Sequence, residues 1–269
     1  MHVLGIVGQS DDETAALVER LCRRLTERGR VATITCAPET DGTDRASLRE
    51  AGAEVSYAIG ADGWVAAGEQ RGLDETLAEL ALAYDYALVA GATDARLPTV
   101  SLGGCEHVGE EIATAEHAAD IDLDALVATL EDGEPYETLA SLVARVKQSA
   151  DSDRAGAIAT FTGRVREHDD PDDPATEYLE FEKYEGVADE RMAAISAELE
   201  ARDGVFEVAL YHRTGVVEAG EDIVFVVVLA GHRREAFRTV EDGIDRLKDE
   251  VPLFKKEVTV ADAVWAHER

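Results

Sequence analysis

The chain has 269 residues, enough for one large domain or two smaller ones, and its net charge is −31, from 57 acidic and 26 basic side chains. So negative a chain argues against nucleic acid or an anionic membrane as a partner. A disordered acidic protein is also excluded, because 45% of the residues are hydrophobic and they recur periodically along the chain.

The three cysteines, Cys22, Cys36 and Cys105, have neither CxxC spacing nor a histidine pairing typical of zinc. We therefore expect reduced thiols and no metal site. No signal peptide and no apolar run of 18 residues is apparent, so we expect a cytoplasmic protein.

The first half of the chain alternates strand patterns with helix patterns, which predicts an α/β domain with a mostly parallel sheet. An acidic run containing Gly and Pro (131–135) is the predicted linker, which gives domains 1–132 and 133–269. The predicted strands are 2–8, 31–36, 55–59, 86–90 and 99–102, and the predicted helices are 12–28, 45–52, 73–84 and 121–130.

The second half predicts an α+β domain whose order of strands and helices is ferredoxin-like in outline. The run 223–230 is almost continuously apolar and β-branched, which is typical of a strand buried on both faces. The predicted strands are 156–166, 178–184, 205–212, 222–230 and one ending at Val258, and the predicted helices are 136–147, 187–202 and 232–251.

The stretch 231–257 concentrates positive charge in a chain that avoids lysine. Three of its five lysines, Lys248, Lys255 and Lys256, lie within nine residues. Arg233 and Arg234 fall in the first helical turn, where free amides and the helix dipole favour anions, so an anion is expected nearby. Each residue alone fits a solvated surface, but the cluster favours a binding site.

The same stretch resembles the MoaE family, the large catalytic subunit of molybdopterin synthase. The motifs are GHRREAF and DRLKDEVPLFKKE near the C-terminus, with AIATFTGRVREHD (157–169), LEFEKYEGVADERM (179–192) and VALYHRTGVVEAGED (208–222) upstream. The resemblance covers about the last 120 residues, in order.

This resemblance implies transfer of sulfur to a cyclic pyranopterin monophosphate from the thiocarboxylate tail of a ubiquitin-like MoaD-type partner. It implies Lys248 and Lys255 as catalytic residues and no cofactor. It also implies a homodimer within a heterotetramer. The implied substrate-binding residues are Arg166, His232, Arg233 and Arg269, of which Arg269 would reach the neighbouring subunit's pocket. His212, within the HRTG motif, fits a structural role as well as a functional one.

The first half resembles MobB, a GTP-binding accessory protein of molybdenum-cofactor assembly, through the strand ending at Gly8 and the REAGAEV run (49–55). However, the segment GQSDDETA has Glu13, Thr14 and Ala15 where a phosphate-binding loop needs glycine, lysine and a hydroxyl residue. We therefore expect the fold without useful nucleotide binding.

Two other functions remain open. The first alternative is a non-catalytic adaptor in molybdenum-cofactor assembly. The second is a nucleotide-dependent cofactor chaperone that acts through the first domain. The acidity and scarcity of lysine resemble proteins of salt-loving archaea, so we also expect a halophilic protein.

Overall fold

The structure is a computed structural model that describes residues 1–36, 54–68, 71–168, 170, 174–184, 186–259 and, by backbone alone, 263–267. The chain divides into two compact units, Met1–Tyr136 and Glu137–Arg269. This division lies slightly beyond the boundary expected after residue 132. None of the described helices is long and apolar enough to cross a membrane.

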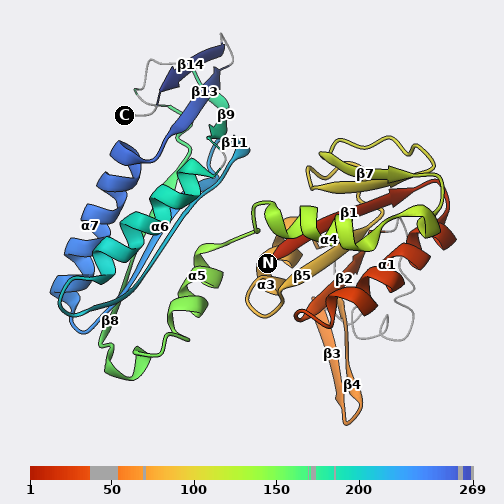
Figure 1. Ribbon diagram of the computed structural model, residues 1–269, viewed down its shortest axis with the longest axis horizontal. Coiled ribbons are helices and arrows are strands. Elements are labelled where there is room, and N and C mark those ends of the chain that lie inside the picture. Colours follow the sequence, from red (N-terminus) through yellow and green to blue (C-terminus); the bar gives the residue numbers. More distant parts are fainter. Residues whose placement is uncertain are drawn as a thin grey trace. The chain divides into compact units, whose positions relative to one another are not determined.

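A five-stranded parallel sheet forms the centre of the N-terminal unit, as its alternating pattern predicted (Figure 1). Its order is β2-β5-β1-β6-β7, with β1 in the middle. The bounds are β1 His2–Gly8, β2 Val31–Thr35, β5 Tyr86–Ala90, β6 Thr99–Leu102 and β7 Glu111–Ala115. The edge strand β7 was not predicted, because its sequence EIATA is short and only partly buried.

Helices cover both faces of this sheet. On one face α1 (Asp11–Leu25) and α4 (Leu123–Asp132) bury a set of leucines against Leu4 and Ile6 of β1. On the other face α3 (Leu73–Leu80) places Leu77 against Val3. Because successive strand residues point to opposite faces, β1 is buried on both. The short 3₁₀ turn η2 (Ala118–Asp120) precedes α4.

The segment expected as a strand at 55–59 is a strand, but it lies outside the parallel sheet. β3 (Val55–Gly60) pairs antiparallel with β4 (Gly63–Gly68) in a separate hairpin, because the chain turns back at once. Ile59 and Trp64 on this hairpin are 86% and 64% exposed. The helix predicted at 45–52 lies outside the described residues.

The C-terminal unit contains two antiparallel sheets, of order β10-β12-β8 and β11-β9-β13-β14, and helices α5, α6 and α7. The helices are α5 Leu139–Val146, α6 Val187–Glu200 and α7 Arg233–Glu250, and a 3₁₀ turn η3 spans Ser152–Arg154. The strands are β8 Ala157–Arg164, β9 Thr176–Lys183, β10 Val205–His212, β11 Gly215–Glu218, β12 Asp222–Ala230, β13 Leu253–Thr259 and β14 Ala263–His267.

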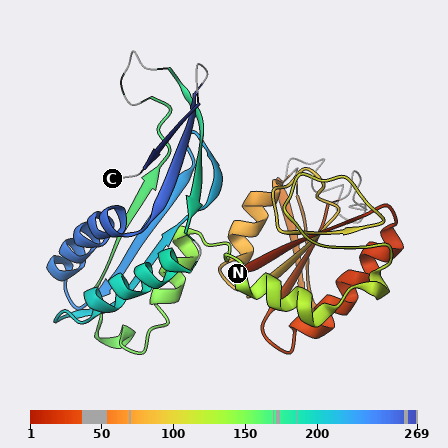
Figure 2. The ribbon, with the colours of Figure 1, turned by 45° about the horizontal axis from the view of Figure 1, so that its top comes forward.

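Strand β12 is buried on both faces, as its apolar run predicted. Val226 and Val228 point into a core shared with α6 and α7, which lie side by side over this face (Figure 2). Phe225, Val227 and Leu229 point the other way, into a core shared with α5. The strand therefore ties the three helices to one sheet.

The ferredoxin-like outline needs one correction, because the strands form two sheets rather than one. Both edges of β12 are already occupied, by β10 and β8. Strand β9 lies in the second sheet, where it pairs with β11 and β13. The helix and strand order within the unit is as predicted, with β11 and β14 added.

We expect folding to require high salt, because 31 uncompensated negative charges repel one another in the compact state. The Debye length is about 3 Å in 1 M salt and about 10 Å in 0.1 M salt, so repulsion grows as salt is removed. The melting temperature, measured by circular dichroism, should fall between molar salt and 50 mM salt. An unchanged melting temperature would show that the charge does not limit stability.

Candidate active site

A cavity of about 430 Å³ opens in the C-terminal unit where α7 ends and β13 begins. Its walls come from strands β8, β9, β10, β12 and β13 together with the last turns of α7. The side chains that matter for charge are Arg164, Arg166, Lys248, Lys255 and Glu257, and the apolar lining includes Phe161, Leu179, Phe181, Ile223, Val224, Ile244 and Leu247. A cavity with four cations and one carboxylate favours an anionic ligand.

The end of α7 brings Lys248 and Lys255 to the same cavity. The helix ends at Glu250, where the amide of Val251 still donates to the carbonyl of Leu247 at 3.1 Å. Pro252 follows and cannot continue the helix. Lys248 in the last turn is exposed, whereas the Lys255 side chain on β13 is 26% exposed. The predicted grouping of these two lysines is therefore present in the structure.

Lys256 points away from the cavity. Neighbouring residues of a strand face opposite sides, and the Lys256 ammonium donates to Glu180 of β9 at 2.8 Å. This hydrogen bond to Glu180 raises the pKa of Lys256 above its usual value. Lys256 is thus a natural control for its neighbour.

Two arginines at the end of β8 complete the positive side of the cavity, Arg164 as its last residue and Arg166 two residues beyond it. Arg166, predicted from the sequence, and Arg164, which was not singled out, both line it and both are exposed. Arg164 is held by the carbonyl of Gly220 and by Asp222, whose carboxylate lies 3.2 Å from its Nε. An arginine guanidinium presents a planar fork that matches a phosphate.

Glu257 is the carboxylate among the charged residues of the cavity, and sequence reasoning missed it. Its Oε1 accepts a hydrogen bond from Thr176 at 2.8 Å, and its Oε2 lies 3.8 Å from the Lys255 ammonium. Its place two residues after Lys255 on a strand was a usable signal, since such residues share a face.

His212 also lines the cavity, and it is 3% exposed. Its Nδ1 lies 2.7 Å from the carbonyl oxygen of Arg213, and its ring meets Phe181 edge to face with centroids 4.8 Å apart. Burial, with smaller effects from Lys183 and Lys248, lowers the pKa of His212 to about 4 although the backbone hydrogen bond opposes the shift. The imidazole is therefore neutral at neutral pH.

The remaining predicted residues do not join this cavity within one chain. His232 caps the start of α7 and Arg233 is its first residue, and both are exposed. Fifteen residues of helix separate Arg233 from Lys248, which is about 22 Å at 1.5 Å per residue. The expected convergence of Arg233 with the lysines is thus wrong for a single chain. Arg269 lies outside the described residues.

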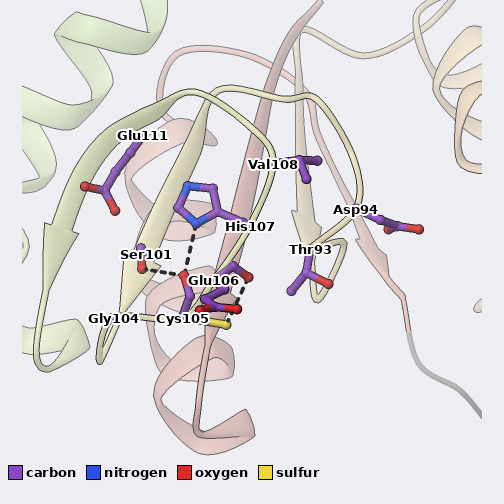
Figure 3. Close-up of a pocket in the computed structure, with 9 residues that line it drawn as sticks. All are labelled: Thr93, Asp94, Ser101, Gly104, Cys105, Glu106, His107, Val108 and Glu111. Atoms are coloured by element: carbon purple, nitrogen blue, oxygen red, sulfur yellow. Dashed lines mark hydrogen bonds between the residues drawn. The ribbon is translucent and has the colours of Figure 1, made fainter.

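A second hollow, of about 620 Å³, lies in the N-terminal unit beyond the carboxyl ends of β5 and β6 (Figure 3). The carboxylates of Asp94, Glu106 and Glu111 line it, and none of its described lining residues is a lysine or an arginine. The carbonyl of Cys105 accepts from Ser101 and faces the Nδ1 of His107 at 3.0 Å (Figure 3). This acidic lining disfavours phosphate.

The turn after β1 does not leave space for a phosphate-binding loop. Only Gln9 and Ser10 separate β1 from α1, and the Ser10 side chain caps the helix. Glu13 turns to the main chain instead, where it accepts from the amide of Ala118 at 2.6 Å. A β-carbon on Gly8 would lie 2.8 Å from the Thr14 hydroxyl. The glycine therefore permits close packing here rather than a loop around phosphate.

Comparison with known proteins identifies the family. The family model described as MoaE protein matches residues 136–250. Over the whole length of both chains, this chain is 54% identical to a protein of Haloferax volcanii named probable molybdopterin synthase. The chain belongs to the molybdopterin synthase family.

Other matches cover about half of the chain. The molybdopterin synthase catalytic subunit of Oryza sativa subsp. indica is 38% identical over 152 residues, 56% of this chain and 76% of that protein. The solved MobB of Bacillus subtilis covers 48% of this chain and 98% of its own, with 20% identity and a TM-score of 0.36. The MoaE match, residues 136–250, lies almost wholly within the unit that contains the cationic cavity and ends before Lys255.

We expect the free energy of unfolding of this chain to fall as the pH falls, partly through His212. Its pKa is about 4 when folded and about 6.5 when unfolded, so between these values the unfolded chain binds the extra proton. The resulting loss of unfolding free energy is absent above about pH 6.5 and grows to about 3 kcal/mol as the pH approaches 4. Chemical denaturation of wild type and His212→Phe at several pH values in molar salt measures the difference.

The His168→Phe variant is the matched control, because His168 is exposed. It should follow the wild-type pH dependence, whereas His212→Phe should lose less stability on acidification. Equal pH dependence in all three proteins would contradict the burial of a neutral His212.

We also expect the N-terminal unit to bind neither GTP nor ATP. The two-residue turn after β1, the engaged Glu13 and the acidic hollow all disfavour a triphosphate. Calorimetric titration with the magnesium nucleotides should give no heat of binding. A dissociation constant below about 10 µM, a binding free energy near −7 kcal/mol, would overturn this expectation.

Proposed function

We propose that the cationic cavity is the site where sulfur passes from a MoaD-type carrier to cyclic pyranopterin monophosphate. The observation that carries this proposal is the charge of the cavity. Arg164, Arg166, Lys248 and Lys255 surround one cavity in a chain whose net charge is −31. Both reactants are anions, one a cyclic phosphate and the other a thiocarboxylate, and each is favoured by converging cations.

The size and the lining of the cavity suit a bicyclic or tricyclic small molecule. Its volume of about 430 Å³ lies in the range of about 300 to 1,000 Å³ that is usual for ligand sites. Apolar side chains such as Phe161 and Ile223 offer a surface to a flat ring system, while Arg166 and Arg164 offer planar forks to the phosphate. We assign the phosphate to the arginine side of the cavity.

Lys248 and Lys255 then act on the atoms that react. In each round the thiocarboxylate sulfur forms a bond to a side-chain carbon of the pterin and displaces the oxygen bound to that carbon, which leaves with the opened phosphate ring or as water. A second water then breaks the bond between sulfur and the acyl carbon. The carrier tail leaves as a carboxylate, and two rounds leave two sulfurs on the substrate. Lys248 and Lys255 stabilise the negative charge that develops at these steps, and an amine is also able to exchange protons.

A second copy of the chain supplies His232, Arg233 and Arg269 in this proposal. A helix of 18 residues keeps the first two away from the cavity of their own chain, and both are exposed and available to a neighbour. A homodimer that places the start of α7 against the neighbouring cavity would add the guanidinium of Arg233 and the imidazole of His232 to each site. With one carrier per site, the assembly is a heterotetramer.

Replacing Lys248 or Lys255 by alanine should reduce sulfur transfer strongly. Removing a preorganised charge aimed at the reacting centre typically lowers the rate about 10² to 10³-fold. Stability should hardly change, because a lysine near a helix end contributes about 0.3 to 1 kcal/mol. The assay measures product formed from purified chain, thiocarboxylated carrier and pterin precursor, alongside the melting temperature.

Lys256→Ala is the matched control, since this lysine neighbours Lys255 but is bonded to Glu180 on the other face. It should retain most of the activity. Arginine at position 248 should partly restore activity if charge alone is needed, and should not if the amine exchanges a proton. Full activity of both alanine variants would exclude the cavity as the site and would favour a non-catalytic adaptor.

A further inference from the structure

Strand β9 contains a β-bulge beside the cavity. Its pairing with β13 moves from Tyr178 directly to Thr176 while β13 advances by one residue, so Glu177 has no partner on that strand. Two residues opposite one define a bulge, which redirects the side chains that follow it. The Glu177 carbonyl accepts from the amide of Ala219, which directly follows β11. The register on the two sides of Glu177 therefore differs by one residue.

The bulge determines which side chain of β9 enters the cavity. Phe181 and Leu179 both line the cavity, and regular alternation would place Glu177 next to them on the same face. The side chain that lines the cavity is instead that of Thr176, which is 6% exposed, whereas Glu177 is exposed to solvent. A hydroxyl group thus occupies a place where a carboxylate would offset one of the four cations.

The Thr176 hydroxyl is linked through one carboxylate to a lysine of the cavity. It donates to Oε1 of Glu257 at 2.8 Å, because a carboxylate only accepts. Oε2 of the same carboxylate lies 3.8 Å from the Lys255 ammonium. Lys255 and Glu257 are two residues apart on β13 and so share the cavity face. The three side chains form a continuous series of contacts from the bulge to the lysine.

The Lys255 side chain needs a restraint to act at a defined point. It is long and flexible, and the three other cations of the cavity repel its ammonium. At 3.8 Å the Glu257 carboxylate attracts the ammonium, but this distance is too long for a hydrogen bond that would fix the direction. The place of the carboxylate therefore decides the place of the ammonium, and the hydrogen bond from Thr176 fixes the carboxylate.

We propose that Thr176 is a positioning residue that holds the Glu257 carboxylate beside Lys255 and so keeps the Lys255 ammonium in place within the cavity. The effect on turnover rests on the proposed function. The effect on Lys255 does not, because the contacts among the three side chains are present without substrate.

The first test observes Lys255 by NMR in the full chain in molar salt. The chain has five lysines, so selective ¹³C labelling gives few ε-methylene signals, and the signal that Lys255→Arg removes is that of Lys255. Thr176→Val replaces the hydroxyl by a methyl group of similar size. The Lys255 signal should move in Thr176→Val and keep its position in Thr176→Ser, which retains the hydroxyl. An unmoved signal in Thr176→Val would overturn the proposal.

The second test measures sulfur transfer from the carrier to the pterin precursor. We expect kcat to fall about tenfold or more in Thr176→Val, since a displacement of about 1 Å can lower a rate about 10²-fold. Thr176→Ser should stay near wild type. KM should change little in both, because the arginines that bind the phosphate in the proposed function are unchanged. Glu177→Gln is the matched control, since this neighbouring side chain is exposed, and it should retain wild-type activity.

A double variant tests whether Thr176 acts through Glu257. Glu257→Ala removes the acceptor of the hydroxyl, so Thr176→Val added to it should lower kcat no further. The Lys255 signal should likewise stay where Glu257→Ala alone places it. Losses of kcat that multiply in the double variant would assign Thr176 to packing and contradict the proposal.

The outcomes distinguish this proposal from the proposed function. If wild type transfers no sulfur, the proposed function fails, and the Lys255 signal still decides the role of Thr176. Full activity in Thr176→Val, or an equal loss in Thr176→Val and Thr176→Ser, would show that the hydroxyl does not position the lysine. Should Thr176→Val fail to fold, Thr176→Ala and Thr176→Ser provide the same comparison.

Discussion

The register of β13 against β9 determines which lysine faces the cavity. Lys255 stands opposite Phe181 and Lys256 opposite Glu180, and a shift of one residue would exchange the two side chains between the faces. Buried Leu253, 1% exposed, fixes this register at the start of the strand. The same short segment follows directly from α7, so the helix end and the strand face are set together. Placement of both lysines at one site is therefore a consequence of core packing.

Charge distribution gives the cavity its selectivity. The net charge of the chain is strongly negative, so the chain repels other polyanions. The charged side chains that line the cavity are mostly positive. In the proposed function, anionic substrates gain attraction where the four cations converge. The neutral state of His212 belongs to the same balance, because burial lowers the pKa of its imidazole. Lysines and arginines serve different needs, since arginine binds phosphate through two parallel donors and lysine is a point charge.

Sequence patterns predicted the elements that carry the site but not how they meet. The apolar period of α7 and the β-branched run of β12 were sufficient to predict these two elements, because burial of their apolar side chains determines both. The lysine cluster predicted Lys248 and Lys255, since a helix end followed by a strand brings them near. Arg164, Glu257 and His212 were missed or left open, because they come from β8, β13 and β10, and their neighbourhood depends on pairing between distant strands. The distance between Arg233 and Lys248 could have been predicted from the sequence, because the two residues lie at opposite ends of one predicted helix.

The N-terminal unit has a parallel sheet in which a two-residue turn follows β1, in place of a loop that would hold a phosphate, and the Haloferax volcanii relative matches the chain along its whole length. We therefore propose that the chemistry takes place in the C-terminal unit. A crystal structure of the chain with the pterin phosphate bound tests this assignment most directly. We expect phosphate density beside Arg166, with the pterin side chain towards Lys248 and Lys255. Density in the acidic hollow lined by Asp94 and Glu111, with the cationic cavity empty, would contradict it.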